Sequence, residues 1–188
     1  YSVVCARNEK GEKASFPVSE NVHIHHILHS STAPAPISKN IAEHAHTLAE
    51  QLADTLEVVG LLAVEFFLTQ DDQLIVNEMA PRPHNSGHYT IDACHTSQFQ
   101  QHIRAITGLP LGKTDTHTPA VMINILGDLW SKTSPPWNLL FKNPSTQLHL
   151  YDKGEARKGR KMGHYTVLDQ NLSLAKKEAE ALFLELKD

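Results

Sequence analysis

Three segments carry apolar residues at the three- and four-residue spacing of an amphipathic helix. The first follows Ser38, a favourable N-cap residue, the second spans residues 97–107, and the third begins at Ser173. The predicted inward positions are Ile41, Ala45, Leu48, Leu52 and Leu56 in the first, Phe99, Ile103 and Ile106 in the second, and Leu174, Leu182, Phe183 and Leu186 in the third.

Other segments have the length and composition of β-strands. Residues 2–8 and 13–18 flank a turn that contains glycine, which predicts a hairpin, and residues 21–28 are predicted as a further extended segment. Residues 58–69 form a nearly continuous apolar run, expected to be a central strand that is covered on both faces. The remaining strands are expected at 74–79, 119–126, 147–151 and 164–168. Hairpins and helices in this mixed order predict an α+β fold, not a doubly wound parallel sheet.

The composition is that of a globular protein with a substantial core. The 188 residues are 40% hydrophobic and 20% charged, and no apolar run approaches the roughly 18 residues of a membrane span. A net charge of −4 argues against a broad nucleic-acid-binding surface. Cys5 and Cys94 lie in apolar contexts without a signal peptide, which predicts buried, reduced thiols in a cytoplasmic protein. The chain begins at Tyr1 and not at Met, so we expect it to be a piece of a longer protein.

Two glutamates are predicted to face each other in one hairpin. If Asp71-Asp72 is a two-residue turn, Glu65 lies opposite Glu78 on the same face, with Thr69 opposite Leu74 and Phe67 opposite Val76. Cross-strand side chains lie about 5 Å apart, and like charges there destabilise a sheet. A magnesium ion that is shared with a polyphosphate would compensate. The alternatives are a salt bridge from one glutamate to Arg or Lys, or a longer turn that separates the pair.

A basic, amide-rich loop follows the second glutamate. Residues 77–88 read N-E-M-A-P-R-P-H-N-S-G-H. Arg82 offers a fork for a carboxylate or acyl phosphate, while His84 and Asn85 can donate to oxyanions. His84 can also move a proton near neutral pH. Pro81 and Pro83 stiffen this loop, which suits a site with fixed geometry.

Four stretches of the sequence carry a resemblance to a known family. They are G-L-L-A-V-E-F-F at 60–67, the 77–90 loop, Q-F-Q-Q-H-I-R-A-I-T-G-L-P-L at 98–111, and P-A-V-M-I-N-I-L-G at 119–127, with Y-D-K-G-E-A-R-K-G-R-K-M-G-H at 151–164 in support. The chain resembles the carboxyl-terminal portion of the 5-(carboxyamino)imidazole ribonucleotide synthases, which are ATP-grasp enzymes of purine biosynthesis. The resemblance implies an ATP-grasp half with an antiparallel sheet and flanking helices over residues 1–115. A small β-rich subdomain with a terminal helix is expected over 116–188.

The resemblance also implies a chemistry and a set of site residues. ATP would phosphorylate bicarbonate to carboxyphosphate, which would carboxylate the amine of 5-aminoimidazole ribonucleotide and leave ADP and phosphate. Glu65 and Glu78 match magnesium ligands, and Asn77 with Glu78 matches a stretch of the ATP site. Arg82, His84, Asn85 and Ser86 match the bicarbonate and carboxyphosphate pocket, and Lys153 and Arg160 match residues that hold the ribonucleotide phosphate. The family is typically dimeric, so a homodimer is implied.

The sequence departs from the family pattern at two points, and three alternative hypotheses of function remain open. Ala80 stands where the wider ATP-grasp pattern often has Asn, and no stretch matches the amino-terminal domain or most of the lid, so the isolated chain is expected to be inactive. One rival is another ATP-grasp ligase of purine synthesis, such as the formate-using glycinamide ribonucleotide transformylase. A second is a zinc-binding module at His23, His25, His26 and His29. The third is an inactive metal-binding fragment.

Overall fold

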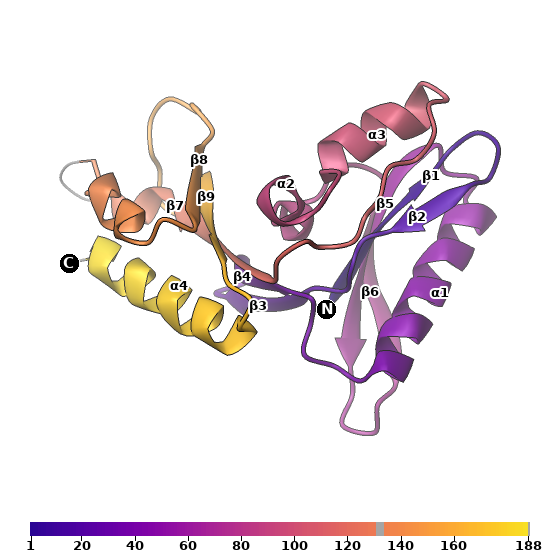
Figure 1. Ribbon diagram of the computed structural model, residues 1–188, viewed down its shortest axis with the longest axis horizontal. Helices are drawn as coiled ribbons and strands as arrows, with labels where there is room; N and C mark the ends of the chain where they lie inside the picture. The colour runs from indigo at the N-terminus through magenta and orange to yellow at the C-terminus, as the bar shows by residue number, and fades with distance from the viewer. Residues whose placement is uncertain (131–133, 188) are drawn as a thin grey trace.

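The computed structural model describes residues 1–130 and 134–187, which form two antiparallel sheets (Figure 1). The first sheet has the strand order β2-β1-β5-β6. Its strands are β1 (Ser2–Arg7), β2 (Lys13–Ser15), β5 (Gly60–Leu68) and β6 (Leu74–Ala80). The second sheet has the order β3-β4-β7-β9-β8. Its strands are β3 (Glu20–Ile24), β4 (Ile27–Ala33), β7 (Ala120–Leu126), β8 (Thr146–Leu150) and β9 (Lys161–Leu168).

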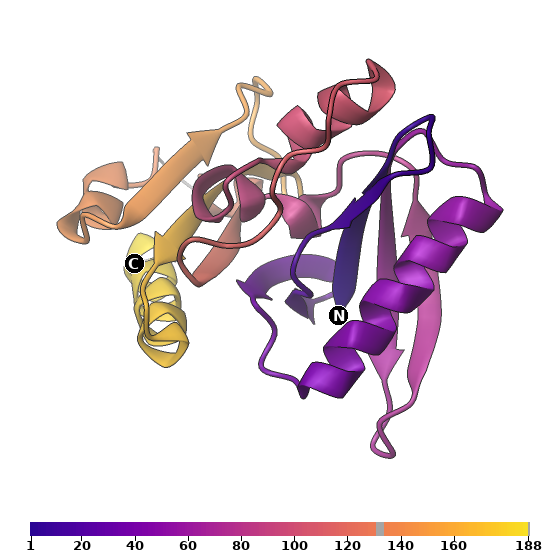
Figure 2. The ribbon, with the colours of Figure 1, turned by 45° about the vertical axis from the view of Figure 1, so that its right-hand side comes forward.

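Helices cover these sheets and complete the cores (Figures 1 and 2). Helix α1 (Lys39–Thr55) packs its alanines on one face of the first sheet, and α2 (Thr90–Ala93) and α3 (Gln98–Ile106) lie on the other. Helix α4 (Leu172–Lys187) covers the second sheet. Short 3₁₀ helices lie at Asn85–Gly87, Gly127–Leu129 and Trp137–Lys142. The predicted α+β fold is confirmed. None of the described helices combines the length and the hydropathy needed to cross a membrane.

The extended segment predicted at 21–28 is in fact a hairpin. Strands β3 and β4 pair with Ile24 opposite Ile27, which leaves His25 and His26 as a two-residue turn. Both have positive φ, 50° and 64°, as the central residues of a type I′ turn require. Histidine is an uncommon residue there, so the sequence offered no Asn-Gly or Gly-Gly signal for this turn.

Helix α3 buries the side opposite to the one predicted. Its N-cap, Ser97, forms a capping box with Gln100. Gln98 and Gln101 are fully buried, whereas Phe99 and Ile103 are exposed. The glutamines are stabilised in the interior because each one hydrogen-bonds to loop backbone.

The other two predicted helices need smaller corrections. Ser38 caps α1 as expected, with its Oγ accepting from the N–H of Ile41, but Leu56 is exposed just after the helix ends. At α4 the capping side chain is Asn171, whose Oδ1 accepts from the N–H groups of Ser173 and Leu174. The helix therefore starts earlier than predicted. Its buried positions are Ala175, Ala179, Leu182 and Leu186, while Leu174 is exposed.

The second sheet draws its strands from both of the expected domains. Strand β4 pairs with β7, so residues 20–33 share a sheet with residues 120–168. The domain boundary predicted between residues 115 and 116 stays a prediction. The chain segment that crosses it joins the two sheets, which lie side by side (Figure 2). The candidate site lies where they meet.

Candidate functional site

The two glutamates of the predicted pair do face each other. Glu65 on β5 is the direct cross-strand partner of Glu78 on β6. The turn, however, spans residues 69–73, with the N–H of Thr69 donating to the carbonyl of Gln73 (3.0 Å). The predicted partners of Thr69 and Phe67 are therefore wrong.

A β-bulge restores the pairing of the two glutamates. Near the turn, Phe67 pairs with Ile75 and Phe66 with Val76. The register shifts between Glu65 and Phe66, which leaves Asn77 as the extra residue of β6. The longer turn and the bulge cancel each other, so the carboxylates come together as the simpler hairpin predicted.

Neither carboxylate is neutralised by a lysine or arginine of the described chain. The nearest basic group to Glu65 is His84, with Nε2 lying 3.9 Å from Oε1, and no described ion pair involves Glu78. The Glu65 side chain is only 17% exposed, which makes an uncompensated charge costly. The salt-bridge alternative therefore fails for the described residues, and the pair has the hard oxygen donors that a divalent cation prefers.

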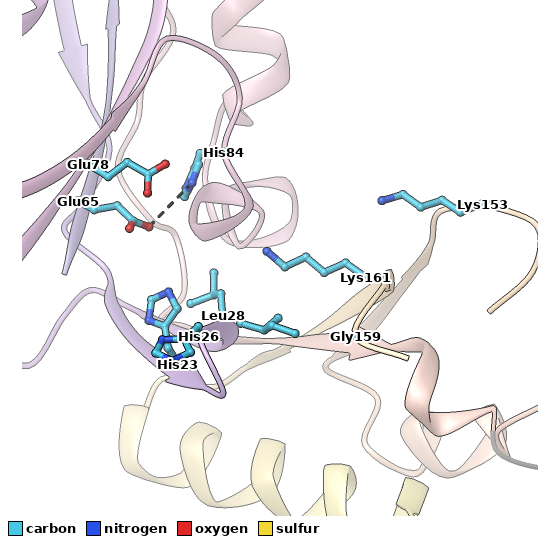
Figure 3. Close-up of a pocket in the computed structure, with 10 residues that line it drawn as sticks. His23, His26, Leu28, Glu65, Glu78, His84, Lys153, Gly159 and Lys161 are labelled. Carbon is cyan, nitrogen blue, oxygen red and sulfur yellow. Dashed lines mark ion pairs between the residues drawn. The ribbon is translucent and has the colours of Figure 1, made fainter. Parts of the chain in front are cut away.

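The glutamates form one wall of a cavity of about 430 Å³ between the sheets (Figure 3). Glu65, Glu78 and His84 lie on the side of the first sheet. The β3–β4 hairpin and the segment around β9 supply the other walls. Their lining residues are His23, His26, Ile27, Leu28, Lys153, Gly159 and Lys161.

Two lysines point into this cavity toward the carboxylate side (Figure 3). Lys153 was predicted, and its Nζ lies 5.2 Å from the centroid of the Tyr151 ring. Lys161, the first residue of β9, was not predicted. Burial lowers the pKa of Lys161, and the Glu65 carboxylate opposes that shift. The cavity thus has an anionic and a cationic wall that face each other.

His84 is held firmly by buried neighbours. Gln98 Oε1 accepts from the backbone N–H of His84 (2.8 Å), and its Nε2 donates to the His84 carbonyl (2.8 Å). Ser86, fully buried, contacts His84 Nδ1 through Oγ at 2.9 Å, which orients the ring from behind. Burial lowers the pKa of His84, only partly offset by Glu65, so its imidazole is neutral near pH 7.

The remaining predicted residues lie outside the cavity lining. Arg82 is exposed, with Nη1 donating to the carbonyl of Pro83 (3.1 Å), and Arg160 donates to the carbonyl of Glu155 (3.2 Å). Asn77 is exposed on β6. Asn85 exchanges amide hydrogen bonds with the buried Asn124 on β7 (2.9 and 2.6 Å). This pair ties the 3₁₀ helix that follows His84 to the second sheet.

The histidine-rich segment does not form the zinc site that was one of the rival readings. His23 and His26 line the cavity, but His29 contacts Glu180 on α4 at 3.3 Å. Among the described residues, no three metal-ligating side chains come together in residues 23–29.

Comparisons with known proteins identify the family of the chain. A family model described as the ATP-grasp domain matches residues 1–99, which is more than half of the chain. The chain belongs to the ATP-grasp family. A second model, the phosphoribosylaminoimidazole carboxylase C-terminal domain, matches residues 120–178 of this ATP-grasp chain. The resemblance seen in the sequence is thereby confirmed.

Relatives of this ATP-grasp chain carry consistent names. It is 53% identical over 169 residues to N5-carboxyaminoimidazole ribonucleotide synthase of Bacillus subtilis. This match covers 90% of the chain and 44% of the relative. The corresponding synthase of Brucella melitensis is 53% identical over 165 residues, covering 88% of the chain and 44% of the relative. The chain therefore spans less than half the length of these relatives.

Solved structures share its fold. N5-carboxyaminoimidazole ribonucleotide synthetase from Thermus thermophilus superposes with a TM-score of 0.90 at 40% identity, covering 98% of the chain and 49% of that structure. The Aspergillus clavatus synthase, solved with ADP and 5-aminoimidazole ribonucleotide, gives a TM-score of 0.89 at 34% identity, covering 98% and 50%.

Proposed function

We propose that this protein is a carbon–nitrogen ligase that carboxylates 5-aminoimidazole ribonucleotide with bicarbonate and ATP. The products are 5-(carboxyamino)imidazole ribonucleotide, ADP and phosphate, in purine biosynthesis. The observation that carries this proposal is one cavity with Glu65 and Glu78 on one wall and Lys153 and Lys161 on the other. The names of the relatives and the ribonucleotide in the Aspergillus clavatus structure support the choice of substrate.

Glu65 and Glu78 would hold Mg²⁺. The pair fits this ion because it is cross-strand and without a described lysine or arginine partner, with Glu65 partly buried and Glu78 open to the cavity. When bound, Mg²⁺ supplies charge neutralisation to the phosphates of ATP. We assign Asn77 to the ATP site beside Glu78, as the family resemblance implies.

The chemistry needs two bond changes. A bicarbonate oxygen takes the γ-phosphoryl group of ATP, which gives carboxyphosphate and ADP. The amine nitrogen then attacks the carboxyl carbon, the C–O bond to phosphate breaks, and the nitrogen loses a proton. His84 borders the cavity with a neutral imidazole, which suits it to accept that proton.

The cations serve the anionic substrates. Lys161 and Lys153 face the carboxylate wall and would hold bicarbonate, carboxyphosphate or the ribonucleotide phosphate. Arg82, Asn85 and Arg160 keep their proposed substrate-binding roles. They lie within two residues of cavity-lining residues along the chain, and Arg82 and Arg160 each donate to a backbone carbonyl that an anion could replace. Ser86, which is buried, acts through His84.

ADP release by the full-length protein separates this function from its nearest rival. With ATP and Mg²⁺, we expect 5-aminoimidazole ribonucleotide and bicarbonate to stimulate ADP release, and glycinamide ribonucleotide with formate to give none. Stimulation by glycinamide ribonucleotide alone would assign the chain to the formate-using ligase. Stimulation by neither substrate pair would contradict both ligase assignments.

We further propose a cytoplasmic homodimer. Cys5 and Cys94 are buried free thiols, as is usual in a reducing compartment. The exposed apolar side chains of Phe99, Ile103 and Ile106 on α3 offer a surface for a second copy. We expect sedimentation to show a dimer that Ile103→Glu converts to a monomer, and an unchanged sedimentation coefficient would contradict this interface.

A further inference from the structure

A second cluster of polar side chains lies outside the catalytic cavity. Asp92 on α2, His149 on β8 and His164 on β9 each offer one donor atom, and these three atoms lie within 4.8 Å of one another. None of the three lines the cavity of Glu65 and Glu78. The cluster brings a helix from the region matched by the ATP-grasp model against two strands of the carboxyl-terminal region.

His164 is the unusual member of this cluster. Its side chain is almost entirely buried, yet its Nε2 has no hydrogen-bond partner in the described structure. The other ring nitrogen, Nδ1, lies 2.6 Å from the hydroxyl oxygen of Tyr151. Leaving a buried polar atom without a partner costs free energy, so this nitrogen calls for an explanation. In a metal-bound histidine, one ring nitrogen binds the metal and the other is typically held by a hydrogen bond to a neighbouring group. His164 has this arrangement, with Nδ1 held by Tyr151 and Nε2 available for an ion.

Asp92 and His149 complete the donor set. His149 Nε2 lies 3.0 and 3.1 Å from the two carboxylate oxygens of Asp92. The rings of His149 and His164 stack, with centroids 4.6 Å apart and planes inclined by 16°. Burial lowers the pKa of His164, which favours the neutral ring, and Nε2 carries the lone pair when Nδ1–H donates to the Tyr151 hydroxyl.

We propose that Asp92, His149 and His164 bind one first-row transition-metal ion of the Zn²⁺ type. Two imidazoles and one carboxylate are a borderline-soft set that suits Zn²⁺ better than Mg²⁺, and a fourth position is left for water. A bound ion must lie in the plane of each imidazole, so the stacked rings have to open. His149, with its side chain 31% exposed, turns toward the ion, whereas the buried His164 stays fixed by Tyr151.

Such an ion would fasten α2 to the β8–β9 pair. The ligands come from residues 92, 149 and 164, so the ion closes the long segment between α2 and the β8–β9 hairpin and stabilises the folded state by its binding free energy. This role does not depend on the proposed carboxylation.

Metal content of the full-length protein tests the site. The protein is dialysed at a fixed free Zn²⁺ concentration with excess Mg²⁺, and bound zinc is measured by mass spectrometry for wild type, His149→Asn and Asp92→Asn. We expect the wild type to retain one zinc per chain more than either variant. The matched control is His117→Asn, because His117, His95 and Asp115 form a similar but exposed grouping, and it should retain as much zinc as wild type.

Tyr151→Phe gives an independent readout. Loss of the hydroxyl that orients His164 should weaken zinc affinity roughly 10–100-fold, with circular dichroism unchanged. Co²⁺ in place of zinc should show intense visible absorption bands in wild type and lose them in His149→Asn. Equal zinc content in wild type, His149→Asn and Asp92→Asn would overturn the proposal.

Discussion

At the residue scale, the proposed chemistry depends on two glutamates and two lysines that line one cavity from opposite sides. The glutamates could be predicted because the two-residue period of a strand fixes which side chains share a face. Lys161 could not, because the segment 153–161 holds five cations and only the start of β9 decides which of them faces the cavity.

Removal of one carboxylate should abolish magnesium-dependent turnover. For Glu65→Gln in the full-length protein we expect kcat/KM to fall at least about 100-fold, because the amide neither carries the charge nor binds the ion as well. Steady-state ADP release measures this, and Asp71→Asn, in the exposed turn of the same hairpin, is the matched control. Wild-type turnover by Glu65→Gln would show that the pair does not hold the ion.

Lys161 should matter for an anionic substrate. Lys161→Met is expected to raise the KM for the ribonucleotide or for bicarbonate about tenfold or more, since a charge-assisted contact contributes about 1.5–3 kcal/mol. Lys158→Met, in the same basic segment but outside this cavity, should leave both KM values unchanged. Equal kinetics for the two variants would remove Lys161 from the site.

At the scale of elements, the sequence predicted most strands and helices but not how three of them are used. Apolar periodicity indicated α3, yet Gln98 and Gln101 face inward because loop backbone satisfies their amides. The β3–β4 hairpin was missed because His25 and His26 adopt positive φ without a glycine. Local periodicity does not predict which polar side chains will be buried because a loop elsewhere in the chain satisfies their hydrogen bonds.

The two buried glutamines of α3 give a matched pair of variants. Gln98→Glu removes the donor to the His84 carbonyl and should lower kcat about tenfold or more, together with a loss of about 1–3 kcal/mol in the free energy of unfolding. Gln101→Glu breaks the equivalent hydrogen bond to the carbonyl of Gly112, so it should lose similar stability and keep its kcat. Chemical denaturation and steady-state kinetics compare the two. Equal kcat values would mean that Gln98 does not position His84.

At the scale of the whole molecule, the proposed function requires the two sheets to be held together at the cavity. The cavity has walls from both sheets, and the Asn85–Asn124 amide pair joins them beside it. Overall fold class and the carboxylate wall could be inferred from sequence. The sequence did not reveal that the two walls of the cavity face each other. That arrangement follows from the pairing of β4 with β7, which lie about 90 residues apart in the chain.

Breaking the amide pair should therefore affect stability and activity together. Asn124→Leu leaves the Asn85 amide without its buried partner, and we expect a loss of about 1–3 kcal/mol in the free energy of unfolding and a lower kcat/KM. Thr166→Val on β9 is the control, because its buried Oγ1 has no partner in the described structure and its loss should be neutral. If Asn124→Leu matches the control in both measurements, the pair does not align the walls.

The most direct test of the central claim is the fate of oxygen from ¹⁸O-labelled bicarbonate in the full-length protein. Phosphorylation of bicarbonate followed by attack of the amine leaves the bridging bicarbonate oxygen on phosphate. We therefore expect one ¹⁸O atom in phosphate for each molecule of 5-aminoimidazole ribonucleotide carboxylated, as measured by mass spectrometry. Phosphate that contains no ¹⁸O while the carboxylated product accumulates would contradict the proposed coupling of ATP to carboxylation.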